Sequence, residues 1–162
     1  MKKNLGQAFF EVSLSFPLPL FLSLFFPFLF SMKAAIGIDI GGTKIAMAIG
    51  YRKGKILDRR EIKTQKNAQV KACIKELIEN LRTLIRESEI RDEEIHGIGL
   101  CFPGAVDTHK GIVPVSPHLE GWDGIPLAKR VSRALNLPVY TANDANAAAL
   151  GERVFGQAKG KQ

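Results

Sequence analysis

Residues 34–50 read AAIGIDIGGTKIAMAIG, two apolar runs joined by a short polar stretch that contains adjacent glycines. The runs Ala34–Ile40 and Ile45–Gly50 are typical of buried strands, and glycines between two such runs indicate a tight hairpin. A carboxylate, two glycines, a hydroxyl and a lysine weaken a strand, so packing does not explain their presence. The stretch therefore predicts a β-hairpin whose turn serves another purpose.

The residues DIGGTK (39–44) have the chemistry of a phosphate site. A glycine pair lets the chain turn sharply and leaves main-chain N–H groups uncovered, and such groups bind anions. Thr43 adds a hydroxyl donor and Lys44 a cation, while Asp39 could hold a hydrated Mg²⁺ that bridges phosphates. The alternative is an ordinary β-turn ordered by its Asp. The hexapeptide fits neither a Walker loop nor a Rossmann fingerprint.

The remaining apolar patterns predict further strands and helices. In Asn67–Glu89, apolar residues recur at the i, i+3, i+4, i+7 spacing of an amphipathic helix. The other predicted elements are the strands Lys55–Lys63, Ile95–Phe102 and Pro138–Asn143 and the helices Leu127–Leu135 and Ala145–Val154. Leading strands followed by alternating helices and strands indicate an α/β domain with a mixed sheet.

A polar pair separates a strand from an alanine-rich helix in NDANAAALGE (143–152). Asp144 stands where a helix N-cap would, and capping alone would account for it. In the functional interpretation, Asp144 accepts a proton from an attacking sugar hydroxyl while Asn143 hydrogen-bonds a neighbouring hydroxyl. The helix dipole favours the negative charge that such an acceptor needs. From these residues alone, both interpretations stay open.

Two loops carry further candidate residues. In CFPGAVD (101–107), Pro103-Gly104 either turns the chain after a strand or brings the backbone close to a ligand beside Asn143. The loop SPHLEGWDGIPL (116–127) contains His118 and Trp122. An aromatic residue in such a loop covers a sugar or, more often, anchors the loop to the core.

Residues 1–31 differ from the rest of the chain, because 13–31 consists only of Phe, Leu, Pro and Ser. A basic start and an apolar run fit a secretory leader or a membrane anchor. However, Pro17, Pro19 and Pro27 break any helix, and no A-x-A-like cleavage site follows. Pyrimidine-only codons specify these four residue types, so we favour a translated pyrimidine tract with initiation at Met32. In the alternative, Met1 is the start and the segment is a signal or an anchor.

Charge and cysteine content narrow the class of protein. Lys and Arg exceed Asp and Glu by 23 to 16. The excess is scattered rather than gathered in an aromatic-rich basic stripe, so no nucleic-acid partner is expected. The two cysteines, Cys73 and Cys101, lie far apart and form no C-x-x-C, which indicates neither a disulfide framework nor a zinc site. Reduced thiols and a cytoplasmic location are the expectation.

Four motifs together resemble a known family. DIGGTK, GLCFPGAVD, HLEGW and VYTANDANAAALGE follow one another in an order and spacing similar to those of the N-terminal lobe of the ROK family. This family contains repressors and sugar kinases, including bacterial glucokinases. The resemblance covers about residues 33–160. It implies an actin-like (ribonuclease H-like) ATPase fold in which two lobes close on ATP and a hexose.

The resemblance also implies roles for individual residues. Asn143 and Asp144 would bind the hexose, with Gly104 beside them and Asp144 as the catalytic base toward the 6-hydroxyl. Asp39 would hold Mg²⁺ through water. The residues implied to face the ATP phosphates are Asp39, Gly41, Gly42, Thr43 and Lys44.

The chain departs from the family pattern in two respects. The family usually has Asn where His118 stands. The chain also shows no second glycine-rich phosphate loop, no adenine pocket and no C-G-x-x-G-C-x-E zinc motif. We therefore expect it to lack the second lobe, and we expect zinc only in that lobe. A site made from one wall would not hold ATP in line with a sugar, so we expect negligible kinase activity from this chain alone.

The sequence therefore predicts the N-terminal part of an ATP-dependent hexose kinase, with the particular hexose undetermined. The alternative is a non-catalytic sugar-binding regulator of the same family. Such repressors carry a helix-turn-helix ahead of DIGGTK, where this chain has its Phe/Leu/Pro/Ser run. The expected ligands are a hexose and ATP, with no membrane partner unless residues 1–31 are a real leader. Self-association, or pairing with a separately encoded second lobe, is also expected.

Overall fold

The computed structural model describes residues 34–51, 54–88, 90, 94–115 and 118–159. The strands are β1 (Ala34–Ile40), β2 (Lys44–Tyr51), β3 (Ile56–Lys63), β4 (Ile95–Phe102) and β5 (Val139–Asn143). The helices are the 3-10 turn Asn67–Gln69, α3 (Val70–Glu87), α4 (Leu127–Leu135) and α5 (Asp144–Phe155). The predictions made for residues 1–31 lie outside the described residues.

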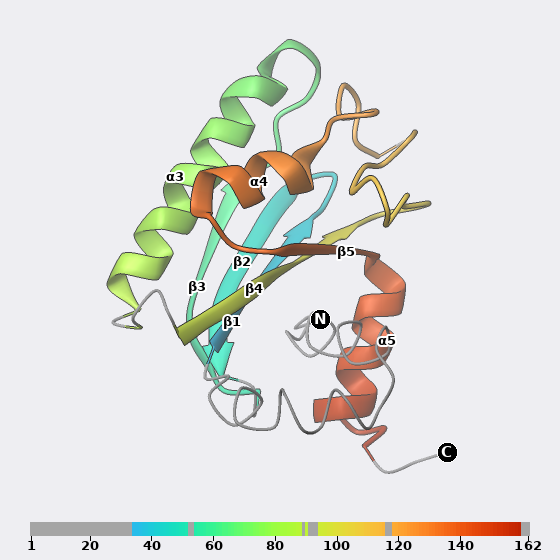
Figure 1. Ribbon diagram of the computed structural model, residues 1–162. Helices are drawn as coiled ribbons and strands as arrows, with labels where there is room; N and C mark the ends of the chain where they lie inside the picture. Colours follow the sequence, from blue (N-terminus) through green and yellow to red (C-terminus); the bar gives the residue numbers. More distant parts are fainter. Residues whose placement is uncertain (1–33, 52–53, 89, 91–93, 116–117, 160–162) are drawn as a thin grey trace.

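The strands form one five-stranded sheet in the order β3-β2-β1-β4-β5. β1 pairs antiparallel with β2, and β2 with β3, whereas β4 runs parallel to both β1 and β5. Helices α3 and α4 lie together over one face of the sheet, and α5 leads away from the end of β5 (Figure 1). The predicted α/β domain with a mixed sheet and flanking helices is confirmed.

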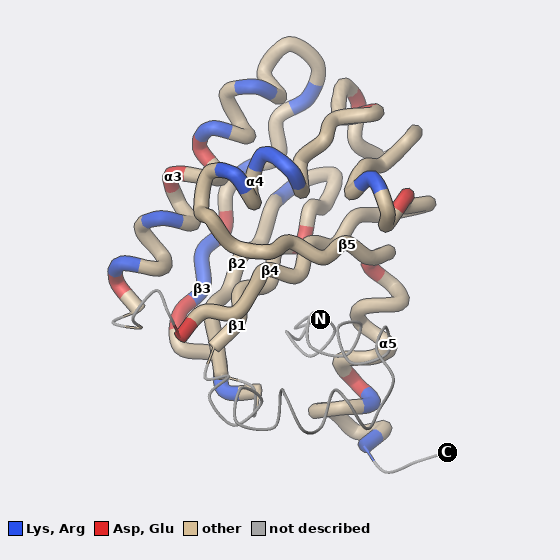
Figure 2. Tube along the Cα trace, in the orientation of Figure 1, with Lys and Arg blue, Asp and Glu red and all other residues tan. Residues whose placement is uncertain are grey.

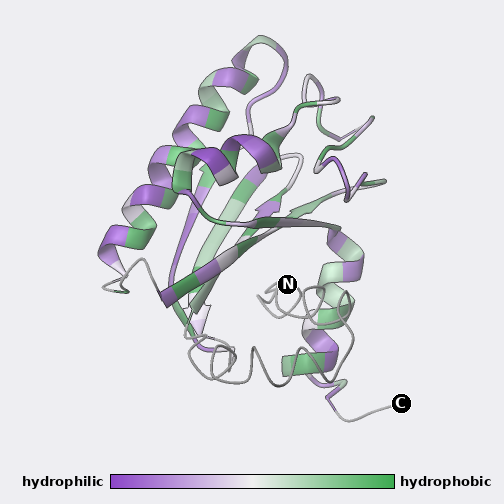
Figure 3. Ribbon diagram, viewed as in Figure 1, coloured by the Kyte–Doolittle hydropathy of each residue, from purple (hydrophilic) through white to green (hydrophobic). Residues whose placement is uncertain are grey.

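The hairpin between β1 and β2 forms where the glycine spacing predicts it. Its register sets Ile36 opposite Ile49 and Ile38 opposite Met47. All four side chains are buried in the core that also contains the apolar residues of α3. Burial of one such side chain contributes about 1.5–3 kcal/mol. In Figure 3, the residues coloured as hydrophobic on α3 alternate with hydrophilic ones, as expected of a helix with one buried side.

The helix α3 begins later than the predicted start at Asn67. Asn67 has a left-handed φ of 53°, which interrupts regular helical geometry but which Asn tolerates better than most residues. Residues Asn67–Gln69 therefore form a 3-10 turn, and the α-helix begins at Val70. Its buried side chains belong to the predicted apolar stripe: Val70, Cys73, Ile74, Leu77, Leu81 and Leu84.

The carboxyl ends of β1, β4 and β5 meet at one edge of the sheet because these strands are parallel. Asp39 is in register with Cys101, and Cys101 with Ala142. The β1–β2 turn, the loop after β4 and the start of α5 all follow directly from this edge. In open α/β sheets, the carboxyl ends of the strands are the usual place for ligands.

The surface of the described residues is mostly polar. Lys and Arg are spread over α3, α4 and the sheet rather than gathered in one stripe (Figure 2). Val115, with 72% of its surface exposed, is the one large hydrophobic side chain of the described residues that is mostly exposed. No helix in the described ranges combines the length and the apolarity that crossing a bilayer requires.

Candidate active site at the carboxyl edge of the sheet

The β1–β2 turn is a close approach of backbone to backbone. The Gly41 N–H donates to the Lys44 carbonyl at 3.0 Å, and a Cβ on Gly41 would lie 2.8 Å from that same oxygen. A Cβ on Gly42 would lie 2.9 Å from the carbonyl oxygen of His118. Neither glycine has a left-handed φ. Both glycines are thus required because a side chain would have no space. The sequence analysis had instead explained them by the sharp turn that glycine allows.

The turn presents main-chain donors without acceptors. Among the residues that the structure describes, neither Gly42 N–H nor Thr43 N–H has a hydrogen-bond acceptor. The carbonyls on the same stretch are engaged, since Thr64 Oγ1 donates to Gly41 O at 2.7 Å and Thr64 N–H donates to Thr43 O at 3.0 Å. Adjacent unengaged N–H groups form a concavity suited to an anion.

Asp39 lies at the base of this turn, near the end of β1. Its side chain is on the sheet face opposite to Ile38 and Ile40, because side chains alternate along a strand. Cys101, in register on β4, shares that face, as does Ala46 on β2. Asp39 is half-buried. A carboxylate beside N–H groups that have no acceptor among the described residues fits a hydrated Mg²⁺ next to phosphate.

Lys44, at the end of the turn, forms an ion pair with Glu61. Its Nζ lies 2.9 Å from Glu61 Oε1, on β3, and Arg59 Nη2 approaches the same oxygen at 3.8 Å. The hydrogen bond from Lys44 holds the pKa of Glu61 below its ordinary value. Sequence reasoning placed Lys44 toward phosphates but did not find Glu61. The pairing depends on the β2–β3 register, for which the local sequence carries no signal.

Asn143, not Asp144, is the N-cap of α5, so the capping interpretation of Asp144 was wrong by one residue. Asn143 has extended backbone angles, and its Oδ1 accepts from Asn146 N–H at 3.1 Å. Asp144 is the first helical residue, and its Oδ1 accepts from Ala145 N–H at 2.7 Å. An amide and a carboxylate therefore lie side by side at the amino end of a helix, where the dipole favours negative charge.

Gly104 lies beside Asn143, and the approach of its backbone to a ligand there stays a prediction. The Asn143 Nδ2 donates to Gly104 O at 2.8 Å and to Asp144 Oδ1 at 3.2 Å. Gly104 has a φ of 87°, which favours glycine, and a Cβ there would meet nothing within 4 Å. The loop after β4 is thus fixed to the start of α5 while its backbone stays exposed.

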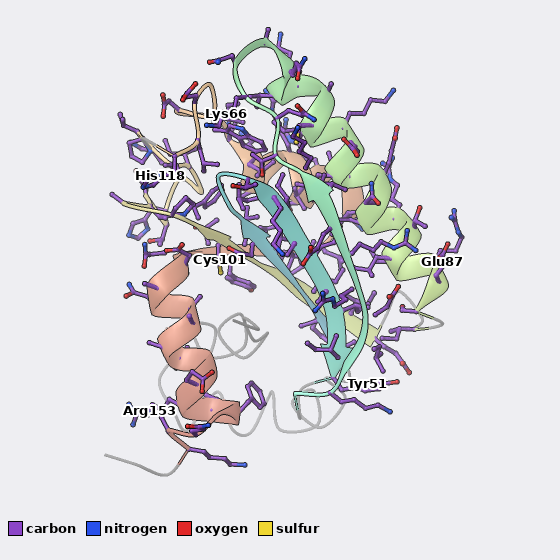
Figure 4. All side chains as sticks on the ribbon, turned by 180° about the vertical axis from the view of Figure 1, so that it is seen from behind. Tyr51, Lys66, Glu87, Cys101, His118 and Arg153 are labelled. Atoms are coloured by element: carbon purple, nitrogen blue, oxygen red, sulfur yellow. The ribbon has the colours of Figure 1, made fainter. Side chains whose placement is uncertain are left out.

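The loop 118–122 packs against the turn and against the segment after β3. Trp122 is 2% exposed, and its Nε1 donates to Gln65 O at 2.8 Å. The Asn67 N–H donates to Glu120 O at 3.0 Å. Trp122 therefore anchors the loop to the core. Figure 4 places His118 and Lys66 toward the same end of the molecule, opposite Tyr51.

The two predicted halves of the site lie at the same edge. Gly41 follows Asp39, Asp144 follows Ala142, and β1 and β5 are separated by β4 alone. Neighbouring strands are spaced about 4.8 Å apart, so the turn and the start of α5 are roughly 10 Å apart. Thr64, which contacts the turn, was missed because it lies at the end of a different strand.

Metal-binding chemistry beyond Asp39 is limited in the described part of the chain. Within these residues there is no group of three or more His, Cys, Asp or Glu side chains that could hold a metal ion. Cys73 is buried and Cys101 is half-buried, and neither forms a disulfide with another described residue. Burial raises the pKa of the Cys73 thiol, which donates weakly to Lys63 O.

Known proteins are similar to this chain in sequence and in fold. Glucokinase from Thermotoga maritima is 33% identical over 126 residues, 77% of this chain and 38% of that protein. A putative xylose repressor from a Caldicellulosiruptor species is 34% identical over 121 residues, 75% of this chain and 30% of the repressor. A ROK family glucokinase from Streptomyces griseus, solved with glucose and AMPPNP, has a TM-score of 0.62 at 32% identity, covering 78% of this chain and 38% of that one.

The chain spans less than two fifths of the length of these relatives. The architecture is that of the actin-like ATPase fold of ROK kinases. The model of the ROK family matches residues 35–162, most of the chain. On this evidence the chain belongs to the ROK family.

Proposed function

We propose that this chain is the N-terminal lobe of an ATP-dependent hexose kinase of the glucokinase type. One observation carries the proposal: the N–H groups of Gly42 and Thr43, which have no acceptor among the described residues, share a sheet edge with Asn143 and Asp144. The first pair suits a phosphate, and the second suits a sugar hydroxyl. The roughly 10 Å between them leaves space for a phosphoryl group and its acceptor.

On the nucleotide side, the turn binds phosphate oxygens through main-chain donors and through the Thr43 hydroxyl. Asp39 would hold Mg²⁺ through water. When bound, the ion neutralises charge on the transferring phosphoryl group. Lys44 is at the same place, although its Nζ is engaged by Glu61 in this structure. A phosphate and the Glu61 carboxylate would therefore compete for one ammonium group.

On the sugar side, Asp144 accepts the proton of the attacking hydroxyl. Its carboxylate is held by Ala145 N–H and Asn143 Nδ2. Because the transition state of phosphoryl transfer is loose, such a residue acts mainly by orienting the nucleophile. The carbonyl of Gly104 and the amide of Asn143 lie next to it and would bind neighbouring hydroxyls.

The larger part of each relative has no counterpart in this chain. We assign the opposite wall of the site, including the adenine contacts and any zinc, to that part. The chain alone should therefore show negligible turnover in a coupled ADP-release assay, since an open site neither excludes water nor aligns the reactants. Use of ATP also favours a cytoplasmic location.

Ligand binding by the full chain tests the proposal. Backbone NMR signals are followed while Mg·AMPPNP and glucose are added separately. Gly42→Ala should weaken the response to nucleotide and preserve the response to glucose, whereas Asp144→Ala should do the reverse. If neither ligand gives a saturable response at the sheet edge, the proposed function is wrong.

The regulator of the same family is the second candidate. The putative xylose repressor is as similar to this chain as the glucokinase is, at 34% against 33% identity. A regulator would respond to a sugar without responding to Mg·AMPPNP. The nucleotide arm of the same titration therefore separates the two candidates.

A further inference from the structure

We propose that Thr64 is a positioning residue that fixes the phosphate-binding turn in its open form. This inference rests on the proposed function of that turn. Thr64 follows β3 and is 5% exposed. It is not part of the DIGGTK motif, from which it is separated along the chain by two strands. Its hydroxyl and its N–H both bond to the turn.

The two bonds from Thr64 hold two different peptide units. The hydroxyl donates to Gly41 O at 2.7 Å, and the N–H donates to Thr43 O at 3.0 Å. In a planar trans peptide, the C=O and the following N–H point in opposite directions. Holding the Gly41 carbonyl toward Thr64 therefore turns the Gly42 N–H away from it.

The same hydroxyl keeps the turn from closing on itself. In a two-residue hairpin, the carbonyl of the first residue accepts from the N–H three residues later. Gly41 O is instead engaged by the Thr64 hydroxyl, and no hydrogen bond from Lys44 N–H to Gly41 O is formed in this described turn. Without the hydroxyl, Gly41 O becomes available to Lys44 N–H, and the Gly41–Gly42 peptide, which carries the Gly42 N–H, is no longer fixed by Thr64.

Burial makes this contact specific to Thr64. A buried hydroxyl needs a hydrogen-bond acceptor, and burial leaves the Thr64 side chain little space to reach an acceptor other than Gly41 O. On the other side, the His118 carbonyl lies against Gly42. The turn is thus enclosed between Thr64 and His118, with the Gly42 N–H directed away from Thr64 and the Thr43 N–H without an acceptor among the described residues. Pre-organised donors of this kind raise affinity because binding then requires no reordering.

Three variants of the full chain test the role of Thr64. Thr64→Val removes the hydroxyl at almost constant volume, and Thr64→Ser retains it. The matched control is Thr141→Val, because Thr141 is also buried, at 4%, and its hydroxyl also faces a backbone carbonyl, that of Thr108 at 3.5 Å. Urea unfolding of each variant checks that the fold is retained.

The first readout needs no ligand. The amide NMR signal and the hydrogen-exchange rate of Gly42 should change in Thr64→Val, return in Thr64→Ser and stay at the wild-type values in Thr141→Val. The second readout is affinity for Mg·AMPPNP. Thr64→Val should bind about tenfold more weakly, the effect of one well-placed hydrogen bond, whereas the other two variants should stay close to the wild type.

The outcomes separate the two proposals. If the wild type responds to Mg·AMPPNP at the turn and folded Thr64→Val responds equally well, the role of Thr64 is refuted and the proposed function stands. The role of Thr64 is also refuted if Thr64→Ser folds but shows the same Gly42 amide signal and the same affinity for Mg·AMPPNP as Thr64→Val. If the wild type shows no nucleotide response, the proposed function fails, and the phosphate role of Thr64 with it. Failure of the proposed function is therefore recognised from the wild-type titration alone, whereas failure of the Thr64 role is recognised by comparing the variants with the wild type.

Discussion

The substitution Gly42→Ala tests the packing of the candidate site most directly. The backbone at Gly42 is not left-handed, so alanine fits its conformation and would by itself stabilise the chain by about 0.4–1 kcal/mol through the unfolded state. However, the new Cβ would lie 2.9 Å from His118 O and 3.5 Å from His118 Cβ. Overpacking of this kind costs about 1–3 kcal/mol. The net expectation is a loss of about 1–2 kcal/mol, with the loop 118–122 displaced.

The assay is urea unfolding followed by tryptophan fluorescence. The chain has one tryptophan, Trp122, and it anchors the displaced loop through Gln65. With a slope of about 1–3 kcal/mol per molar urea, a loss of about 1–2 kcal/mol should lower the midpoint by roughly 0.3–2 M. The emission of the folded variant should also shift, because the indole environment changes.

Gly104→Ala is the matched control. A Cβ there meets nothing within 4 Å, but the φ of 87° is unfavourable for alanine. This control should lose about 1 kcal/mol from backbone strain while the native emission of Trp122 stays unchanged. If Gly42→Ala shows the wild-type midpoint and the wild-type emission, the loop does not rest on the turn and the described enclosure is wrong.

Two further predictions concern ionisable groups. In Lys44→Met, the pKa of Glu61 should rise toward its ordinary value, because the hydrogen bond from Lys44 is the main cause of its low pKa. Since the folded pKa is lowered, the stabilisation is present above the unfolded pKa and is lost as pH falls through the folded pKa, so the unfolding midpoints of variant and wild type should converge in acid. An unchanged carboxyl titration, followed by NMR, would contradict this. In the folded chain, iodoacetamide at mildly alkaline pH should label half-buried Cys101 before Cys73, whose thiol is buried and has a raised pKa. Labelling at equal rates, measured by peptide mass spectrometry, would count against that burial.

Much of the fold is predictable from local patterns. The strands Ala34–Ile40 and Ile95–Phe102 and the helix Leu127–Leu135 have the predicted bounds, because uninterrupted apolar runs and amphipathic spacing depend on nearest neighbours in the sequence. The predicted start of α3 at Asn67 was wrong. Asn67 has a left-handed backbone, and its N–H donates to the carbonyl of Glu120, which is far away along the chain. The prediction of Asp144 as the N-cap of α5 was wrong. Asn and Asp are both good N-caps, and the side-chain geometry of the folded chain selects Asn143.

The sequence by itself determined the hairpin, the alternation of strands and helices, and the residue types of a phosphate turn and a sugar-binding pair. These are encoded by periodicity and by glycine, which act over a few residues. Only the tertiary structure decided that the parallel direction of β1, β4 and β5 brings Gly42 and Asp144 to one edge. It also decided that Glu61 engages Lys44 and that Thr64 holds the turn. Such contacts depend on strand register and on packing between distant segments, and no local pattern specifies either.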